Sequence, residues 1–126
     1  MNWQKVWAFN KYWVMSKSQK QYDYIRCLAK NNQWTPHKSQ ELRNIIDLLE
    51  SVSPTRKTLT TTYQHIWGYF KKKCNNEELH RYLRLLDGLQ PDDDNLGPFL
   101  AQLTKKYQID YLEKSRIIIE LNKREN

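Results

Sequence analysis

The stretch KTLTTTYQHIWGYFKK, residues 57–72, carries the clearest signal for the fold. On a helical wheel its large apolar side chains fall within one sector, which predicts a helix with one buried face. These apolar residues are Leu59, Tyr63, Ile66, Trp67 and Phe70. The opposite, polar sector holds Lys57, Thr61, Gln64, His65, Gly68 and Lys72, with Tyr69 at its edge. We therefore expect an amphipathic helix with a glycine at the centre of its polar side.

The position of Gly68 needs an explanation, because glycine costs a helix interior about 1 kcal/mol relative to alanine. A partner backbone or ligand that comes close to the helix would offset this cost. It would be flanked by Gln64 and His65 one turn earlier and by Lys72 one turn later. Such a donor-rich, cationic groove suits a phosphate or the edge of a sugar. The alternative is that another helix of the same domain packs closely against Gly68.

The rest of the sequence predicts further helices, and strand-like alternation is scarce. Helices are expected over about 3–16, 19–30, 36–50, 76–86 and 97–107. The expected N-caps are Ser18, Thr35 and Asn75, the first and last with Gln or Glu three residues later as in a capping box. The expected buried stripes are Tyr22, Ile25 and Leu28; Leu42, Ile45, Ile46 and Leu49; Leu79, Tyr82, Leu83 and Leu86; and Leu100, Leu103 and Tyr107. Connections are predicted at 31–33, 51–57 and 87–95.

The tail after Asp110 is ambiguous. Tyr111 and Leu112 are compatible with a helix, whereas RIIIEL, residues 116–121, is compatible with an extended segment. The last residues, 122–126, are expected to fray. Because no linker is long enough to divide the chain, we predict a single all-α domain over residues 1–126. Its architecture is expected to be a compact bundle of five or six helices.

The composition excludes several classes of protein. With a mean hydropathy of −0.91, the longest aliphatic run is only residues 117–119, whereas a membrane helix needs about 20 apolar residues. The N-terminus lacks the apolar core and cleavage site of a secretory signal. The two cysteines, Cys27 and Cys74, form no CxxC motif, and nothing demands an oxidising compartment. We therefore expect a cytoplasmic protein without a membrane segment.

Positive charge is concentrated in the first part of the chain. The chain holds 21 Lys and Arg against 14 Asp and Glu, a net charge of +7. Residues 1–73 carry 13 basic and 4 acidic side chains, a balance of +9, while residues 74–126 carry 8 and 10, a balance of −2. Such an excess attracts polyanions, and nucleic acid is the commonest one in a cytoplasm. The alternative is a lysine-rich surface that only keeps the protein soluble.

No catalytic or metal motif emerges from the sequence. His65 and Cys74 lie nine residues apart, which on one helix means opposite faces and about 13 Å of rise, too far for a nucleophile–base pair. Glu77 and His80 form a Glu-x-x-His motif, but a di-iron bundle needs that motif twice. The three aspartates at 92–94 lack the spaced oxygen ligands of an EF-hand, and we interpret them as a solvated helix N-terminus. We expect no enzyme activity, cofactor or metal.

YQHIWGYFKKK, residues 63–73, resembles the most characteristic stretch of the YbgA-like family, a domain of unknown function. Members carry Gln-His, two residues and Gly-Tyr-Phe-Lys, matched here by Gln64, His65, Gly68, Tyr69, Phe70 and Lys71. NKYWVMSKS, residues 10–18, is similar to a second family run, with Asn10 in place of the usual histidine and Ser16 in place of alanine. Further similar positions are Pro98, Tyr111 and Leu112. The resemblance covers about residues 3–112, and the tail departs from the family's proline-containing ending.

The resemblance implies a role in handling RNA. Some members occur alone, some are encoded near photolyases, and others are fused behind a thiouracil-desulfidase domain in enzymes that remove sulfur from 4-thiouridine of tRNA. In those fusions the YbgA-like part is taken to hold the tRNA, while the catalytic part uses an iron–sulfur cluster on three cysteines. Cys27 and Cys74 alone cannot supply that cluster. If the family role holds, a separate desulfidase chain would be the catalytic partner.

We therefore expect a nucleic-acid-binding accessory module for tRNA or another structured RNA, linked to desulfuration of thiolated nucleosides by a separate chain. The expected contacts to phosphates and sugars are Lys11, Lys57, Gln64, His65, Lys71 and Lys72. Gly68 is the expected point of close approach. Tyr12 and Tyr69 could stack on an exposed base. Three alternatives stay open: a protein-interaction adaptor that receives a partner helix in a groove at Gly68, a DNA-related role beside a photolyase, and a small hydrolase or transferase of unknown chemistry.

Overall fold

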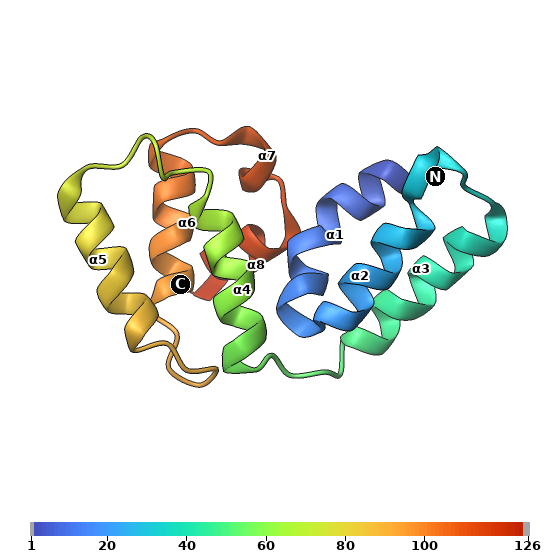
Figure 1. Ribbon diagram of the computed structural model, residues 1–126, viewed down its shortest axis with the longest axis horizontal. Helices are drawn as coiled ribbons and strands as arrows, with labels where there is room; N and C mark the ends of the chain where they lie inside the picture. Colours follow the sequence, from blue (N-terminus) through green and yellow to red (C-terminus); the bar gives the residue numbers. More distant parts are fainter. Residues whose placement is uncertain (1, 125–126) are drawn as a thin grey trace.

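The computed structural model describes residues 2–124, and these fold into helices joined by turns and loops, with no β-strand in that span (Figure 1). The elements are α1 (Trp3–Lys17), α2 (Gln19–Leu28), the 3₁₀ turn η1 (Lys30–Asn32), α3 (Pro36–Leu49), α4 (Arg56–Trp67), α5 (Asn76–Asp87), α6 (Leu96–Lys106), α7 (Asp110–Glu113) and α8 (Arg116–Arg124). The all-α prediction is confirmed, with eight α-helices among the described residues in place of the expected five or six. None of the helices in this part of the chain is both long and apolar enough to cross a membrane.

Local side chains set where the helices begin. Ser18 and Thr35 cap α2 and α3, and each hydroxyl oxygen accepts the backbone N–H three residues on, at 3.1 and 3.2 Å. Asn75 and Glu78 form the predicted capping box of α5: the Glu78 N–H donates to Asn75 Oδ1 at 2.8 Å and the Asn75 N–H to Glu78 Oε1 at 3.1 Å. Thr55 caps α4 in the same manner, although its surroundings predict only a connection. Each cap satisfies N–H groups that have no partner within the helix.

The helix α4 ends earlier than its apolar pattern predicts. The expected helix over 57–72 stops at Trp67, and the chain continues as a series of turns through residues 68–73. Here some backbone hydrogen bonds reach back only three residues, as from Phe70 N to Trp67 O at 2.8 Å. The tighter winding still carries Phe70 into the core, where its exposed fraction is 0%. The whole apolar sector is therefore buried as predicted, although the regular helix is shorter.

The described part of the tail is helical. RIIIEL, residues 116–121, lies in α8, so the extended alternative is wrong. The buried residues of this helix are Ile117, Ile118 and Leu121. They recur at helical spacing because one face of α8 packs against α1 and α6. Residues 122–124, where fraying is predicted, complete the helix, and 125–126 lie outside the described residues.

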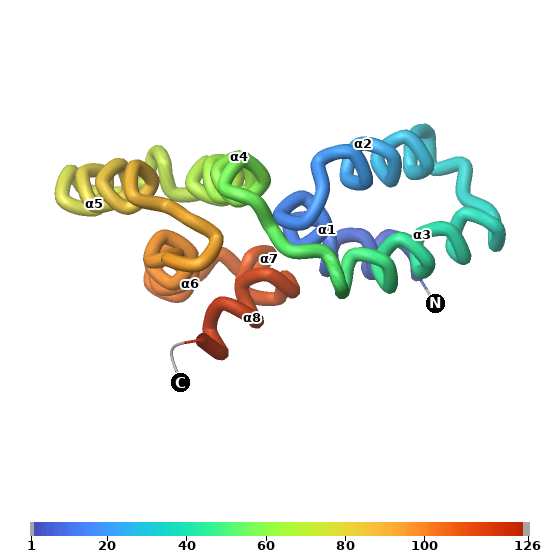
Figure 2. The backbone as a smooth tube through the Cα atoms, turned by 90° about the horizontal axis from the view of Figure 1, so that it is seen from below, coloured from blue at the N-terminus to red at the C-terminus, as the bar shows by residue number. Residues whose placement is uncertain are grey.

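Helix α1 is the hub of the fold. It packs against α2 and α3 on one side and against α4 and α8 on the other, while α6 packs against α4, α5, α7 and α8. Figures 1 and 2 show the result, in which α1–α3 form one group, α4–α8 form a second, and α1 lies at their junction. Trp13, Val14 and Met15 of α1 are each at most 3% exposed and fill this junction. The two groups therefore share one core.

Helix α5 buries the predicted stripe except for one residue: Tyr82 is buried, and Leu79 and Leu86 pack partly buried against the core. The pattern predicts a buried Leu83, but that side chain is 51% exposed. Tyr82 is buried as predicted, and its ring stacks on Trp67 with the ring centroids 4.1 Å apart. Because large flat rings gain most from such contact, this pair sets the rotation of α5 about its axis and turns Leu83 outward.

Candidate functional site

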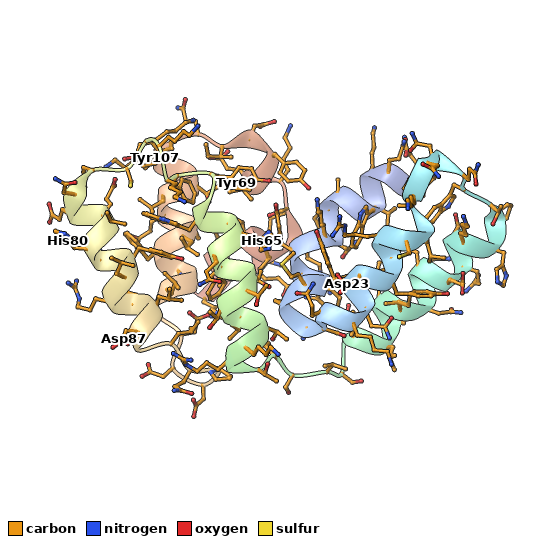
Figure 3. All side chains as sticks on the ribbon, in the orientation of Figure 1. Asp23, His65, Tyr69, His80, Asp87 and Tyr107 are labelled. Atoms are coloured by element: carbon orange, nitrogen blue, oxygen red, sulfur yellow. The ribbon has the colours of Figure 1, made fainter. Side chains whose placement is uncertain are left out.

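Free positive charge gathers just beyond α4. The turns over residues 68–73, which we call the lysine turn, end in three consecutive exposed lysines, 71–73. Within the described residues, none of these three ammonium groups forms a salt bridge. Gln64 and His65 are exposed on the last turns of α4, and Figure 3 shows His65 on that helix with Tyr69 just past its end. Hydrogen-bond donors and cations therefore share one end of α4.

Gly68 caps the C-terminus of α4 with helical backbone angles, φ −53° and ψ −27°. A left-handed turn therefore does not explain the glycine. A Cβ at this position would lie 3.1 Å from the carbonyl oxygen of His65 and 4.0 Å from that of Gln64, both in the same helix. Across residues 2–124, no other helix comes within 4 Å of that point, so the packing alternative finds no neighbour here. The glycine surface is open to an approaching partner.

Four tyrosines meet where α1, α2, the lysine turn and α7 come together, and we call them the tyrosine cluster: Tyr12, Tyr22, Tyr69 and Tyr111. The hydroxyls of Tyr12 and Tyr69 are hydrogen-bonded at 3.0 Å, and their rings meet edge to face with centroids 6.3 Å apart. The rings of Tyr69 and Tyr111 are stacked, with centroids 6.3 Å apart and planes 23° apart. The cluster ties the lysine turn to the first and last parts of the chain.

The members of the tyrosine cluster differ in how exposed their side chains are. Tyr12 is 7% exposed, because α1 is the hub of the fold, and it has no open ring face for a base. The predicted stacking role therefore does not fit Tyr12. Tyr69 is half-buried and Tyr111 is 40% exposed, so these two form the outward side. Tyr111 was missed as a site residue because its place in the ambiguous tail gave no sign that it would reach Tyr69; only the family resemblance pointed to it.

Burial raises the pKa of three tyrosines of the cluster. Burial raises the pKa of Tyr12, and the hydrogen bond with Tyr69 raises that pKa further. Burial also raises the pKa of Tyr22 and that of Tyr111. Because the ordinary pKa of tyrosine is already about 10, these hydroxyls stay neutral at physiological pH. These three hydroxyls therefore add no negative charge that would repel a phosphate.

Of the other two predicted phosphate contacts, Lys57 lies apart from this end of α4 and Lys11 does not. Lys57 is exposed in the first turn of α4 and, at about 1.5 Å of rise per residue, stands about 15 Å along the axis from Trp67. Lys11 is half-buried on α1, with its ammonium nitrogen 5.8 Å from the centroid of the Tyr12 ring. Lys11 therefore lies next to the tyrosine cluster, whereas Lys57 lies at the end of α4 opposite to Gln64, His65 and the lysine turn.

The two parts of the chain pair their charges differently. Every salt bridge that the structure describes takes its cation from the C-terminal part, namely from Lys106, Lys114, Arg116 or Arg124. In the N-terminal part, Asp23 accepts from the neutral Gln19 at 3.0 Å and Glu41 from the neutral Tyr24 at 2.7 Å, while Glu50 pairs with Arg116 of the C-terminal part. The 13 basic side chains of residues 1–73 are therefore left without a carboxylate partner among the described residues.

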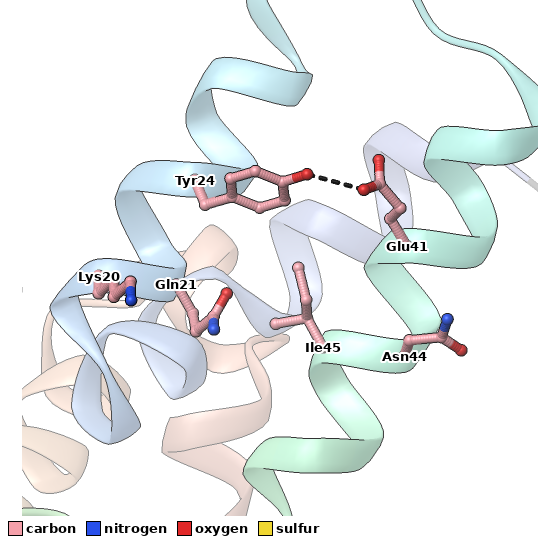
Figure 4. Close-up of a pocket in the computed structure, with 6 residues that line it drawn as sticks. All are labelled: Lys20, Gln21, Tyr24, Glu41, Asn44 and Ile45. Atoms are coloured by element: carbon pink, nitrogen blue, oxygen red, sulfur yellow. Dashed lines mark hydrogen bonds between the residues drawn. The ribbon is translucent and has the colours of Figure 1, made fainter.

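Grooves open on both faces of the first helical group. One lies between α2 and α3, with a cavity of about 380 Å³ lined by Lys20, Gln21, Tyr24, Glu41, Asn44 and Ile45 (Figure 4). The Tyr24 hydroxyl donates to Glu41 across this groove, so its aromatic ring is held by the opposite wall. Another groove lies between α1 and α7 and includes Tyr111 in its lining. This second groove is continuous with the tyrosine cluster.

No metal centre is assembled in the part of the chain that the structure describes, since no three His, Cys, Asp or Glu side chains come together there in a way that could hold a metal ion. Cys74 lies beyond the end of α4, half-buried, with its Sγ 3.8 Å from the carbonyl oxygen of Lys71. Because the helix ends before it, the single-helix geometry considered for Cys74 and His65 does not apply.

Asp94 corrects the interpretation of residues 92–94 as solvated. Its side chain is 3% exposed. One carboxylate oxygen accepts the Tyr63 hydroxyl at 2.5 Å and pairs with Arg124 at 3.0 Å, and the other accepts the Gly97 N–H at 2.8 Å. We call this group the Asp94 anchor. It joins the start of α6 to α4 and α8, which is a structural role and leaves no open coordination for a cation.

Comparisons with known proteins assign the chain to a family. A search of curated proteins and a search of solved structures each found no match. A family model described as "Protein of unknown function (DUF1722)" matches residues 11–120. The match includes the lysine turn and all four residues of the tyrosine cluster, and it is consistent with the YbgA-like resemblance. The chain therefore belongs to the DUF1722 family, a domain of unknown function.

Proposed function

We propose that this protein binds structured RNA, with tRNA as the first candidate, as a module without catalytic residues of its own. The observation that carries the proposal is the lysine turn, whose three exposed lysines have no carboxylate partner and stand beside the exposed side of the tyrosine cluster. A lysine held by a carboxylate must break that pair before it binds a phosphate. These lysines need not, so their full Coulomb attraction is available to a polyanion.

The groups around the lysine turn suit the parts of an RNA backbone. The lysines would neutralise phosphates and release the counterions condensed on them. The Gln64 amide and the His65 imidazole, both exposed, would donate to or accept from ribose hydroxyls. Gly68 adds an open surface where a backbone can come close. The stacked rings of Tyr69 and Tyr111 would offer an aromatic face to an unstacked base.

We propose further that any chemistry on a bound tRNA belongs to a separate chain. The family resemblance supports desulfuration of thiolated nucleosides as that chemistry. The two cysteines are too few for a three-cysteine cluster, and Cys27 is exposed on α2 while Cys74 follows α4. The role of this chain would be to hold and position the RNA.

Fluorescence anisotropy with labelled tRNA, with duplex DNA and with a non-nucleic polyanion tests this function. The logarithm of the tRNA affinity should fall linearly with the logarithm of the salt concentration. A variant with Lys71→Glu, Lys72→Glu and Lys73→Glu should lower tRNA affinity by at least about tenfold and reduce the salt slope by about 2–3, because each lost phosphate contact lowers the slope by slightly less than one. Its melting temperature should not change.

A matched control reverses the same number of charges elsewhere. Arg84→Glu, Lys105→Glu and Lys123→Glu alter three exposed cations of the C-terminal part that make no salt bridge within the described residues. This control should keep most of the tRNA affinity. An equal loss in both variants would show that net charge alone matters. Tighter binding of duplex DNA would favour the DNA-related alternative, and no binding to tRNA at low salt would favour the protein-interaction adaptor.

A further inference from the structure

The groove between α1 and α7 has the size of a small ligand site. Its cavity is about 380 Å³, and its lining includes Lys5, Ala8, Phe9, Asp110, Tyr111 and Lys114. Ligand pockets usually hold about 300–1,000 Å³, so this groove lies at the small end of the range. A partner helix would need a longer apolar trough, whereas a single flat group with a charged substituent would fit.

Two exposed aromatic rings face solvent in this groove. Phe9 is 41% exposed and Tyr111 is 40% exposed, so both are unusually open for side chains of their type. Tyr111 is nevertheless held in place, because its hydroxyl donates to the Ala8 carbonyl oxygen at 3.4 Å and its ring stacks on Tyr69. The groove thus shares one fixed ring with the tyrosine cluster beside the lysine turn.

Positive charge lies among these aromatic side chains. Lys5 is exposed and has no carboxylate partner among the described residues. Lys114 pairs with Asp110 at 3.1 Å, but the two side chains are 76% and 77% exposed, and ion pairs as exposed as this contribute little. Lys114 can therefore exchange this carboxylate for a phosphate at small cost.

We propose that this groove receives one unpaired nucleotide of the bound RNA, with the base against Phe9 and Tyr111 and the flanking phosphates at Lys5 and Lys114. The proposal rests on the RNA-binding function proposed above. In a paired helix the faces of the bases are covered by their neighbours, so only an unpaired base can present its face to a protein ring. The protein would recognise structured RNA with a bulge, loop or end that lies within reach of the lysine turn.

Two RNA hairpins that are identical except for one bulged 2-aminopurine nucleotide test this inference. Stacking of one base on an aromatic side chain is worth about 1–3 kcal/mol, so the bulged hairpin should bind about tenfold tighter than the paired one. Binding should also quench the fluorescence of the 2-aminopurine. Phe9→Ser should bring the ratio of the two affinities toward one and remove most of the quenching, and Lys5→Glu should lower the ratio as well.

Leu48→Ser is the matched control, because Leu48 is a 58%-exposed apolar residue of α3 that lies outside the groove. This variant should keep the wild-type ratio. Asp110→Asn should raise the affinity for the bulged hairpin, since it frees Lys114; an apolar peptide in the groove would not respond in this way. Equal binding of the two hairpins by the wild-type protein would overturn the groove assignment and leave RNA binding at the lysine turn intact. No binding to either hairpin would overturn both proposals.

Discussion

Residues 2–73 and residues 74–124 differ in how many of their cations are paired with carboxylates. In the second region, Glu78 is 12% exposed and binds Lys106 at 2.6 Å, and the carboxylate of Asp94 is 3% exposed and binds Arg124. In the first region, the lysines and arginines have no carboxylate partner among the described residues. The second region pairs several of its cations with carboxylates, and the first region leaves all of its described cations without a carboxylate partner, although Lys17, Lys38 and Arg56 donate to backbone carbonyls.

The difference fits the proposal that the first region presents the binding surface. Arg116 joins the two regions: it pairs with Glu50 at 2.5 Å, donates to Asn10 at 3.1 Å, and places its guanidinium 3.7 Å from the Trp13 ring centroid. This contact and the tyrosine cluster connect the two regions. Binding sites gain precision when fixed elements hold the contacting groups.

The largest loss of stability is expected from a side chain added at Gly97, next to the Asp94 anchor. A Cβ there would lie 2.6 Å from Leu121 Cδ2, 2.6 Å from the Tyr63 hydroxyl and 2.9 Å from an Asp94 carboxylate oxygen. The hydroxyl and the carboxylate are bonded to each other, so neither can move away without losing that bond. Gly97→Ala should lower the free energy of unfolding by about 2–3 kcal/mol, measured by urea denaturation.

Gly88→Ala is the control for this change. A Cβ at Gly88 would meet only the carbonyl oxygen of Arg84 at 3.9 Å, an ordinary contact, so its stability should stay near that of the wild type. Similar losses of unfolding free energy in the two variants would contradict close packing of Gly97 against the Asp94 anchor.

A smaller effect should follow from neutralising Glu78. Burial raises the pKa of this carboxyl, but hydrogen bonds from Lys106, Tyr107 and the Asn75 N–H outweigh burial and hold its pKa below the usual value. A carboxyl with a lowered folded-state pKa stabilises the fold above its unfolded-state pKa, and this contribution is lost as the pH falls through the folded value. Glu78→Gln keeps an oxygen that can accept the Asn75 N–H, so the capping box can persist, but it loses the ion pair with Lys106. The change should therefore cost of order 1 kcal/mol at pH 7 and much less near pH 3.

Urea denaturation at the two pH values measures this difference. Asp87→Asn, an exposed carboxylate at the other end of α5, should show no comparable loss at pH 7. A Glu78→Gln cost that is the same at both pH values would mean that packing, and not the ionised carboxylate, carries the contribution.

Short-range chemistry made most of the fold predictable. The caps at Ser18, Thr35 and Asn75 depend on neighbours three residues away, and they form as expected. The rotation of α5 and the structure of the tail depend on contacts between distant segments, such as the stacking of Tyr82 on Trp67. A periodic pattern in the sequence does not show which distant side chains will pack against each other. For this reason Leu83 was placed inside and residues 116–121 stayed ambiguous.

The candidate site was predictable only in part, for the same reason. The sequence identified Gln64, His65, Lys71 and Lys72 as candidate contacts, and they lie together at the end of α4 and in the lysine turn, although the two lysines follow the helix and are not part of it. It could not show that Tyr12 is buried, or that Tyr111 stacks on Tyr69 from the far end of the chain. Nor could it show which cations lack carboxylate partners, because pairing depends on how the helices come together.

The smallest effect on stability is expected at Gly68, on the boundary between the two regions. Alanine favours helical backbone angles by up to about 1 kcal/mol over glycine, and Gly68 has such angles. Against this, the new Cβ would stand 3.1 Å from the His65 carbonyl oxygen, which must yield by a few tenths of an ångström. The free energy of unfolding of Gly68→Ala should therefore differ from that of the wild type by less than about 1 kcal/mol.

The tRNA affinity of Gly68→Ala is more informative than its stability. If an RNA backbone comes close to Gly68, the added methyl should weaken tRNA affinity several-fold while the thermal melt hardly changes. Gly88→Ala is again the control, because Gly88 also caps a helix C-terminus with negative φ but follows α5 in the C-terminal region. It should bind tRNA like the wild type. A Gly68→Ala variant that binds tRNA normally would remove close approach as the reason for the glycine. A loss of stability well above 1 kcal/mol would instead return Gly68 to a packing role that no neighbouring helix of the described structure explains.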